Sequence, residues 1–355
     1  MIEIYKDWQL QTSHPVFSSF IWRRRFSTAG EFQFVTQFQP EEIGALQFGE
    51  LPQEQFNDYW HYFKPMQVDR QGRVTDRGNI IFKPDTNEAA FITSRQKMDT
   101  INGGQIMVVR GFTLPILFDR RVVTLEGSFS LQALLSNIIN NNFLAGAGGN
   151  RSMVDVLTLL PFTAPPTTIF AQYRQRTAKS ILDDLLGENN MGVRINKNFD
   201  TRMFDIEFYH PVETDVVFNR DFNNILEQDF SEDTERHKNV VFVGDDFIHN
   251  NTAHRGFDRF EMSAPLPQPQ AQTPTQAAVD AMFHNRARRT LSSIINPYNY
   301  QYQYLTDWDL GSVVLSQSRA LGFEEREIIT EITERHDVEG FNITVTTGDF
   351  MERGR

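Results

Sequence analysis

The stretch that decides the fold is residues 79–123, NIIFKPDTNEAAFITSRQKMDTINGGQIMVVRGFTLPILFDRRVV. It holds three apolar runs typical of β-strands, at 80–82, 89–101 and 106–109. Residues 83–86 predict a turn because Pro84 presets its φ angle, and the Asn-Gly-Gly at 102–104 accepts the positive φ of a hairpin. The pattern therefore predicts a three-stranded antiparallel meander, which residues 118–123 complete. Since so apolar a unit is unstable alone, we expect it to form the wall of a β-barrel or sandwich.

Length and composition limit the class of protein. The 355 residues are enough for two or three domains. Lys and Arg number 34 against 46 Asp and Glu, a net charge of −12 without a basic block, which disfavours tight binding to a phosphate backbone. The absence of cysteine excludes disulfides, zinc ribbons and thiol nucleophiles.

The sequence also gives no sign of export or membrane insertion. The N-terminus lacks the basic and apolar regions of a signal peptide. The most apolar run, 106–118, contains Arg110 and Pro115 and is shorter than the ~20 residues of a membrane span. We therefore expect a protein made in a cytoplasm, without stable membrane insertion.

Residues 1–126 are predicted to form a first β-barrel domain. Besides the meander, strands are expected at 3–5, 20–26 and 31–36. The arginines at 23–25 lie between Trp22 and Phe26, and we interpret them as part of a strand with one solvated face rather than a nucleic-acid site. Residues 49–79 break the strand pattern. They are predicted to be an inserted excursion with a short helix at 53–62 and a loop at 69–77.

Residues 127–218 are predicted to form a small α+β domain. Ser130 can cap a helix whose leucines and isoleucines follow helical spacing, at 131, 134, 135, 138 and 139. Thr177 can cap a second helix with inward residues at 181, 182, 185 and 186 and with Gly187 as its C-terminal cap. Strands at 191–195 and 203–209 are predicted to form a hairpin. The glycine-rich loop at 145–149 lacks the residues of a phosphate-binding loop.

Residues 219–355 are predicted to form a second β-barrel domain. A buried strand is expected at 240–244, and a Pro-rich linker at 262–276 leads through a capping box into a helix with Val279, Met282 and Phe283 inward. Tyrosines at 298, 300, 302 and 304 alternate with polar residues and predict a strand; others are expected at 311–316, 327–333 and 341–346. The predicted fold class is α+β and β-rich, with two β-barrel domains flanking a small α+β domain.

The candidate chemical sites are weak. Asp307-Trp308-Asp309 has a spacing that binds Mn²⁺ in some sugar-nucleotide transferases, but no nucleotide-binding unit accompanies it, which favours a polar turn. The adjacent acidic pairs at 183–184, 245–246 and 324–325 diverge from one another, so they do not form the acid and base of a glycosidase. The eight histidines are scattered, and His249 with His254 is a weak metal pair. We predict no catalytic residue, no cofactor and no metal site, and hence a protein that is not an enzyme.

Several segments together resemble a known family. Residues 22–32, WRRRFSTAGEF, are similar to the W-x-R-x-(Y/F)-x-x-x-G-E-F stretch of siphophage tail-tip hub proteins, which correspond to the N-terminal hubs of tail-associated lysins. Residues 106–123 resemble the family's strand and its closing L-D-R-R. Residues 218–244 resemble its F-x-x-x-x-x-N-I-L…K-N-V-x-x-V-G segment, and residues 307–314 its D-x-D-L-G-D-x-V, with Ser312 in place of Asp. The order is the family's, and the resemblance covers nearly the whole chain.

The resemblance implies a structural protein of the virion with a fold similar to the baseplate hub of contractile phages. In that family a homotrimer closes the distal end of the tail tube, and its two β-barrel domains per subunit give a pseudo-six-fold ring through which DNA passes in transit. Implied partners are the distal tail or tube protein, the tape-measure protein, and fibre or receptor-binding proteins. Two departures are the long excursion at 49–79 and the lack of a lysin-like or fibre-like extension after Arg355.

The excursion carries a cluster of five aromatic residues, Phe56, Tyr59, Trp60, Tyr62 and Phe63. One interpretation is a small local core under the loop. The interpretation that we favour is an interface with a neighbouring subunit or another tail protein, because aromatic side chains anchor protein contacts.

The alternative to a hub is a cell-wall hydrolase or a carbohydrate-binding module that acts at the bacterial surface. A hydrolase needs convergent carboxylates or a metal site, and neither is visible in the sequence. A carbohydrate-binding module would bind glycan as a monomer. Oligomeric state therefore separates the hub from these alternatives.

Overall fold

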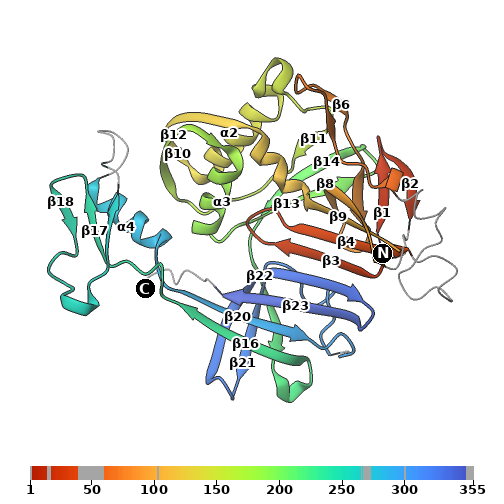
Figure 1. Cartoon of the computed structure of the whole chain (residues 1–355). Coiled ribbons are helices and arrows are strands. Elements are labelled where there is room, and N and C mark those ends of the chain that lie inside the picture. The colour runs from red at the N-terminus through yellow and green to blue at the C-terminus, as the bar shows by residue number, and fades with distance from the viewer. Residues whose placement is uncertain are drawn as a thin grey trace.

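The computed structural model of this chain describes residues 2–13, 17–38, 60–101, 104–264, 266, 273–299 and 301–348. Two strongly curved β-sheets lie one above the other in Figure 1. A layer with two helices packs beside the upper sheet, and a small separate unit projects to one side. The predicted β-rich α+β class is confirmed. Among the described residues, no strand pairing closes either sheet into a complete barrel.

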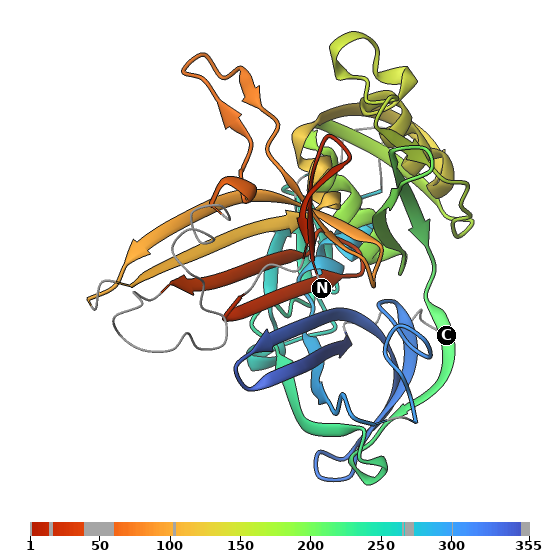
Figure 2. The ribbon, with the colours of Figure 1, turned by 90° about the vertical axis from the view of Figure 1, so that its right-hand side faces the viewer.

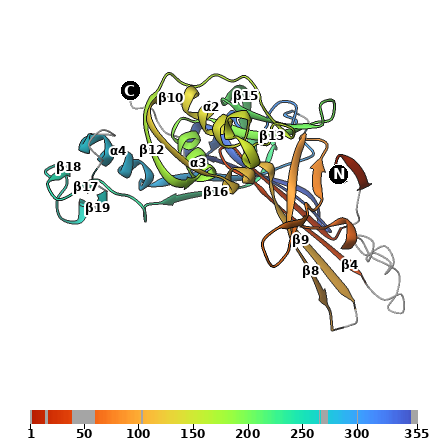
Figure 3. The same ribbon diagram turned by 90° about the horizontal axis from the view of Figure 1, so that it is seen from above.

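The upper sheet is built around the predicted meander. Its strands are β1 (Glu3–Lys6), β2 (Gln9–Ser13), β3 (Ser19–Arg25), β4 (Glu31–Phe38), β7 (Ile80–Lys83), β8 (Glu88–Asp99) and β9 (Gln105–Thr113). The three strands of the meander are confirmed, because β7 pairs with β8 and β8 with β9, both antiparallel. Residues 118–123, which were expected to complete it, do not: they lie in η2 (Leu114–Arg120) and at the start of β10 (Val122–Ser130), which pairs elsewhere. The alternation of β3 and β4 buries Phe20, Trp22, Phe32 and Phe34 in one core. Strands β4, β8 and β9 extend beyond this core as an arm (Figures 2 and 3).

The described part of the excursion is partly regular. Residues 60–62 are helical, at the end of the predicted helix. The predicted loop at 69–77 is wrong in part, because β5 (Gln67–Val68) and β6 (Val74–Asp76) form a short hairpin that projects from the sheet (Figure 2). The Asp69 carboxylate accepts hydrogen bonds from the backbone N–H groups of Gln71 and Arg73, both at 2.9 Å, and these bonds stabilise the tight turn.

The helical layer follows the sequence pattern closely. It consists of η2 (Leu114–Arg120), β10 (Val122–Ser130), α2 (Leu131–Asn142), η3 (Ala145–Ala147), η4 (Gly149–Arg151), β11 (Leu157–Leu159), β12 (Thr168–Thr177), α3 (Ala178–Glu188), β13 (Gly192–Asn198) and β14 (Met203–Tyr209). The hydroxyls of Ser130 and Thr177 accept the predicted capping bonds. The predicted inward residues of both helices are buried, and β13 and β14 form the predicted hairpin.

Two details of this layer differ from the expectation. Gly187 is not the cap of α3, since the helix continues through Glu188 and ends at Asn189, whose side chain donates to the Leu185 carbonyl at 2.8 Å. The residue 126/127 boundary falls inside β10, and the core of this layer includes Phe82, Leu117 and Phe118 from the first segment. The layer and the upper sheet are therefore packed as one body.

The lower sheet contains β15 (Val212–Phe218), β16 (Ile225–Asp233), β20 (Arg288–Ile295), β21 (Ser312–Ser318), β22 (Phe323–Asp337) and β23 (Gly340–Gly348), with η5 (Arg220–Phe222) between β15 and β16. The three predicted C-terminal strands are confirmed. The predicted tyrosine strand at 298–304 is wrong: its described residues form turns, and Tyr302 and Tyr304 pack on the core of the lower sheet while Tyr298 is exposed. The Tyr304 side chain can point inward from this irregular segment because its hydroxyl donates a hydrogen bond to the buried Glu334.

A small unit projects from the lower sheet at the left of Figure 1. It consists of β17 (Val240–Val243), β18 (Phe247–His249), η6 (Gly256–Asp258), β19 (Glu261–Ala264) and α4 (Pro274–His284). Thr273 caps α4 as predicted, accepting from the Gln276 N–H at 3.2 Å. Val279 faces outward, contrary to the expectation, because Ala278 and Met282 are the residues that meet the unit's core. The predicted strand at 240–244 thus belongs to this unit rather than to the lower sheet.

Candidate functional site at the junction of the two sheets

The two sheets are joined edge to edge by β3 and β22. These strands pair antiparallel over seven residue pairs, from Ser19 opposite Asp337 to Arg25 opposite Glu331. The result is one continuous sheet in the order β11-β14-β13-β8-β9-β4-β3-β22-β23-β20-β16. Both strands also place charged side chains in the interior, Arg24 from β3 and Glu334 from β22.

Arg24 is the centre of the junction. Its side chain is 2% exposed, and its Nε lies 2.8 Å from Oε1 of Glu88 on β8. Its remaining N–H groups donate to the Tyr304 hydroxyl at 3.0 Å and to both carboxylate oxygens of Asp309. The second oxygen of Glu88 accepts from the Trp22 indole N–H at 3.1 Å. One arginine therefore ties a strand of the upper sheet to the loop that precedes β21 in the lower sheet.

A second buried ion pair lies beside the first. Lys83 of β7 and Glu334 of β22 are each 1% exposed, and their charged atoms are 2.8 Å apart. The Tyr304 hydroxyl donates to the other oxygen of Glu334 at 2.8 Å, so the two pairs form one network. Buried charges are tolerated only when they are paired and hydrogen-bonded in this way.

The pKa shifts reflect the burial. For Arg24, burial acts to lower the pKa, but Glu88, Tyr304 and Asp309 outweigh it and raise the pKa well above its ordinary value. Burial raises the pKa of the Tyr304 phenol, which remains a hydrogen-bond donor at neutral pH. Burial lowers the pKa of His336, near the far end of β22, to about 4, and the charge of Lys83 acts in the same direction. With their pKa values raised, neither Arg24 nor Tyr304 is poised to exchange a proton near neutrality, as a general acid or base would be.

Residues 23–25 belong to a strand with one solvated face, as predicted, and the central arginine lies on its buried face. Arg23 and Arg25 are about one-third exposed and pair with Glu31 and Glu331, whereas Arg24 points inward with Trp22 and Phe26. The period-two alternation of a strand requires this arrangement once Trp22 is buried. The sequence contained the signal, since Arg24 occupies the same face as two aromatic residues.

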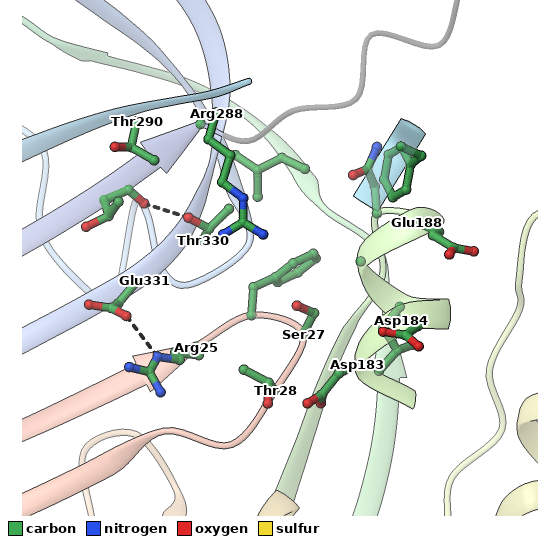
Figure 4. Close-up of a pocket in the computed structure, with 18 of the residues that line it drawn as sticks. Arg25, Ser27, Thr28, Asp183, Asp184, Glu188, Arg288, Thr290, Thr330 and Glu331 are labelled. Atoms are coloured by element: carbon green, nitrogen blue, oxygen red, sulfur yellow. Dashed lines mark hydrogen bonds and ion pairs between the residues drawn. The ribbon is translucent and has the colours of Figure 1, made fainter. Parts of the chain in front are cut away.

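A cavity of about 490 Å³ opens next to the junction, between the β3–β4 turn, α3, and the start of β20 (Figure 4). Arg25 and Glu331 lie on one side, and the α3 carboxylates Asp183, Asp184 and Glu188 lie on the other. Arg288 enters from β20. The cavity therefore has walls of both signs.

Most of these wall charges have protein partners. Arg25 donates to Glu331 at 2.9 Å, Asp183 pairs with Lys179, and Asp184 pairs with Arg176 at 2.5 Å. The adjacent carboxylates Asp183 and Asp184 thus diverge to different partners, as predicted. Charges satisfied in this way stabilise the packing of α3 against the β3–β4 turn, which Lys179 also contacts through Thr28 at 2.9 Å.

The other candidates from the sequence are polar turns or scattered groups. Asp307 and Asp309 lie in a turn, as predicted: Asp307 accepts from the Gln303 N–H at 2.6 Å, and Asp309 pairs with Arg24. In the part of the chain that the structure describes, no group of three or more His, Asp or Glu side chains could hold a metal ion. Within the same part, no helix is long and apolar enough to cross a membrane.

Three of the five aromatic residues of the predicted interface, Trp60, Tyr62 and Phe63, lie among the residues that the structure describes. Phe56 and Tyr59 lie outside the described residues. Phe63 is fully buried, with its ring 4.6 Å from that of Phe34, so it occupies a local core and offers no surface to a partner. Trp60 and Tyr62 pack partly buried against the same core. The Arg95 guanidinium lies 4.1 Å from the Trp60 ring centroid, and its N–H donates to the Trp60 carbonyl.

Comparison with known proteins identifies the family of the chain. Residues 2–349 match the family described as siphovirus ReqiPepy6 Gp37-like protein. No curated protein matches the sequence. The fold is similar to that of the prophage MuSo2 43 kDa tail protein from Shewanella oneidensis, with a TM-score of 0.54 and 9% identity over 98% of this chain and 97% of that chain.

Two further solved structures have a similar fold. The tail protein from Neisseria meningitidis MC58 has a TM-score of 0.55 and 10% identity over 98% of this chain and 96% of that chain. A chain of the lidded Francisella PdpA–VgrG complex has a TM-score of 0.51 and 9% identity over 98% of this chain and 52% of that chain. At these identities the likeness concerns the fold alone. The chain belongs to the siphovirus ReqiPepy6 Gp37-like protein family, and it has the fold of phage tail proteins.

Proposed function

We propose that the protein is the hub of the tail tip or baseplate, a homotrimer that closes the distal end of the tail tube and lets DNA pass after host attachment. The observation that carries this proposal is the edge-to-edge union of two curved sheets in one chain through β3 and β22. Three such chains around an axis present six curved sheets, which matches the six-fold tube that the family resemblance implies. The hub would act in the virion, at the end of the tail.

The buried ion network suits this role. A subunit that contributes two sheets to one ring must hold the sheets at a fixed angle to each other, since a change in that angle would open the ring. If the sheets separated, Arg24 would lose Asp309 and keep Glu88, and Lys83 would lose Glu334 and keep Asp85. The buried Glu334 carboxylate would then have lost its lysine. Because an unpaired buried charge is costly, the network resists such separation.

The charge of the chain suits a passage for DNA. Each phosphate contact by Lys or Arg adds affinity through counterion release, which would hold DNA inside a channel. A net charge of −12 favours passage without tight binding. The partners in this proposal are a distal tail or tube protein, the tape-measure protein, and fibre or receptor-binding proteins.

The test is assembly with the tube. The purified protein would be mixed with the tube or distal tail protein of the same phage and imaged by negative stain. The proposal expects ring-shaped particles and tubes closed at one end. If the protein stays monomeric with and without the tube protein, the hub role is wrong, and a zymogram on cell walls would then test the hydrolase alternative.

A further inference from the structure

A second cavity, of about 770 Å³, lies away from the junction. It is lined by residues of the β1–β2 turn, the β5–β6 hairpin, η2, the segment before β11 and the turn before β14. Its volume is within the range of pockets that bind ligands or anchor side chains. Neither the junction nor the proposed ring of sheets uses it.

The floor of this cavity is aromatic. The ring centroids of Trp8 and Phe204 are 4.9 Å apart, and those of Tyr5 and Phe82 are 4.5 Å apart. Trp8 adopts a φ of +64°, which is unusual for a bulky residue. This turn conformation places the Trp8 ring over the floor rather than in solvent, and backbone strain of this kind gathers at binding sites.

The walls carry four arginines, Arg77, Arg120, Arg121 and Arg202. Arg120 lies over the Phe91 ring, 4.5 Å from its centroid. The Nε of Arg121 is buried without a hydrogen-bond partner, while its other N–H groups donate to main-chain carbonyls of Arg120 and Arg151. Among the described residues, none of the four forms an ion pair with a carboxylate.

The cavity is positively charged, whereas the chain as a whole is negatively charged. The chain carries a net charge of −12, and at the junction Arg23, Arg24 and Arg25 are all paired. Here four arginines meet only two lining carboxylates, Asp7 and Asp155, which leaves a local charge of +2. Burial and the neighbouring Arg121 charge lower the pKa of Arg120, so a bound anion would relieve an unfavourable arrangement.

The composition of the lining indicates what kind of ligand fits. Arginine, methionine and large aromatic residues are enriched at protein–protein interfaces, whereas lysine and glutamate are depleted there. The lining contains all of the enriched types and no lysine, glutamate or alanine, while Asp7, Asp155 and Ser152 are its residues of depleted types. Met66 and Val74 at its rim are 45% and 53% exposed, so apolar contact continues outside the cavity. A phosphate backbone would instead favour an extended basic stripe.

We propose that this cavity binds an acidic segment of another tail protein, with one aromatic or aliphatic side chain on the floor formed by Trp8 and Phe204 and with carboxylates against the four arginines. Carboxylates are matched by guanidinium groups because planar, charge-assisted hydrogen bonds form between them. The proposal does not depend on the trimeric hub, since a monomer would present the same cavity.

The test uses the full chain and synthetic peptides read by fluorescence anisotropy. The probe is a short labelled peptide of aspartate and glutamate around one central phenylalanine. Matched probes replace the phenylalanine with glycine, or the acidic residues with lysine, and a short single-stranded oligonucleotide serves as the nucleic-acid probe. Thermal melting checks that each protein variant is folded.

The decisive variant combines Arg77→Gln and Arg202→Gln, because neither side chain forms a hydrogen bond or an ion pair with any other residue that the structure describes. Trp8→Asn tests the floor, since Asn tolerates positive φ. Arg319→Gln, at an exposed site on the lower sheet, is the control. We expect the acidic phenylalanine peptide to bind, more weakly at high salt, with at least a tenfold loss in the double variant and in Trp8→Asn and no loss in the control.

Several results would overturn the proposal. These are no binding of the acidic peptide below about 1 mM, equal binding by the double variant, or equal binding of the glycine or lysine peptide. Tighter binding of the oligonucleotide through the same arginines would assign the cavity to nucleic acid instead.

Discussion

The guanidinium of Arg24 and the carboxylate of Glu88 lie 2.8 Å apart inside the molecule, on strands β3 and β8, while the opposite side of the same guanidinium contacts Asp309 of the lower sheet. Arg24→Met would remove the cation that both carboxylates share and leave Glu88 buried with the Trp22 N–H as its remaining hydrogen-bond donor. We expect the free energy of unfolding to fall by about 3–5 kcal/mol, measured by urea denaturation.

The matched control for this change is Arg23→Gln. Its side chain is 35% exposed and pairs at the surface with Glu31, so its loss should cost no more than about 1 kcal/mol. If both variants were equally stable, the junction network would not be what holds the two sheets together.

Two glycines should respond to alanine with opposite signs. A Cβ at Gly30 would lie 2.0 Å from the Arg23 carbonyl oxygen, where β3 and β4 approach closely, so Gly30→Ala should destabilise by about 2–3 kcal/mol. A Cβ at Gly187 would meet nothing within 4 Å, and this residue is inside α3. Gly187→Ala should therefore stabilise by about 0.5–1 kcal/mol. Melting temperatures of the two variants give the signs, and a destabilising Gly187→Ala would argue for a helix end at that residue.

Stability should fall in mild acid partly through His336. Its pKa in the folded protein is about 4, below the ordinary 6.5, because the ring is buried and lies near Lys83. Between these pH values the unfolded chain binds a proton that the folded protein does not, so the free energy of unfolding falls as the pH drops from 6.5 toward 4. His336→Phe keeps the stacking on Phe341, at 4.3 Å, but cannot titrate. Melting curves across this range should show a smaller loss for the variant, and identical slopes would exclude His336 as a source.

The aromatic cluster should divide into core and surface. Phe63→Ala should cost about 3–5 kcal/mol, because the side chain is fully buried against Phe34. The double change Tyr59→Ser and Trp60→Ser should cost less stability and weaken assembly with a neighbouring subunit or tail protein, if these two residues anchor an interface as proposed. Analytical ultracentrifugation with the tube protein measures assembly, and unchanged assembly would leave the cluster with a packing role alone.

Local features of the fold could be predicted because their causes lie within a few residues. The caps at Ser130, Thr177 and Thr273 each satisfy the N–H three residues on, and the meander depends on two short turns. Helix caps and tight turns of this kind depend on neighbouring residues in the sequence and little on the rest of the fold. The structure therefore reproduces them almost residue for residue.

Long-range features could not be predicted in the same way. The pairing of β3 with β22 joins residues as far apart as Arg23 and Thr333, and no short pattern specifies a partner at that distance. The strand alternation indicates that Arg24 points inward, but its partners Glu88 and Asp309 are distant in sequence and could not be predicted. The arginine-lined cavity is assembled from separate segments of the first two predicted domains, and neither segment alone has a binding motif. The resemblance to tail-tip hubs predicted a phage tail protein, and the family match and the fold agree with that class.

The central claim, a trimeric hub, is tested most directly by the mass of the particle in solution. Mass photometry would be carried out on the purified chain alone and after mixing with the tube or distal tail protein. The proposal predicts a species with three times the 41.1 kDa of one chain, either alone or on contact with the tube protein. A single species at the mass of one chain under both conditions would contradict it.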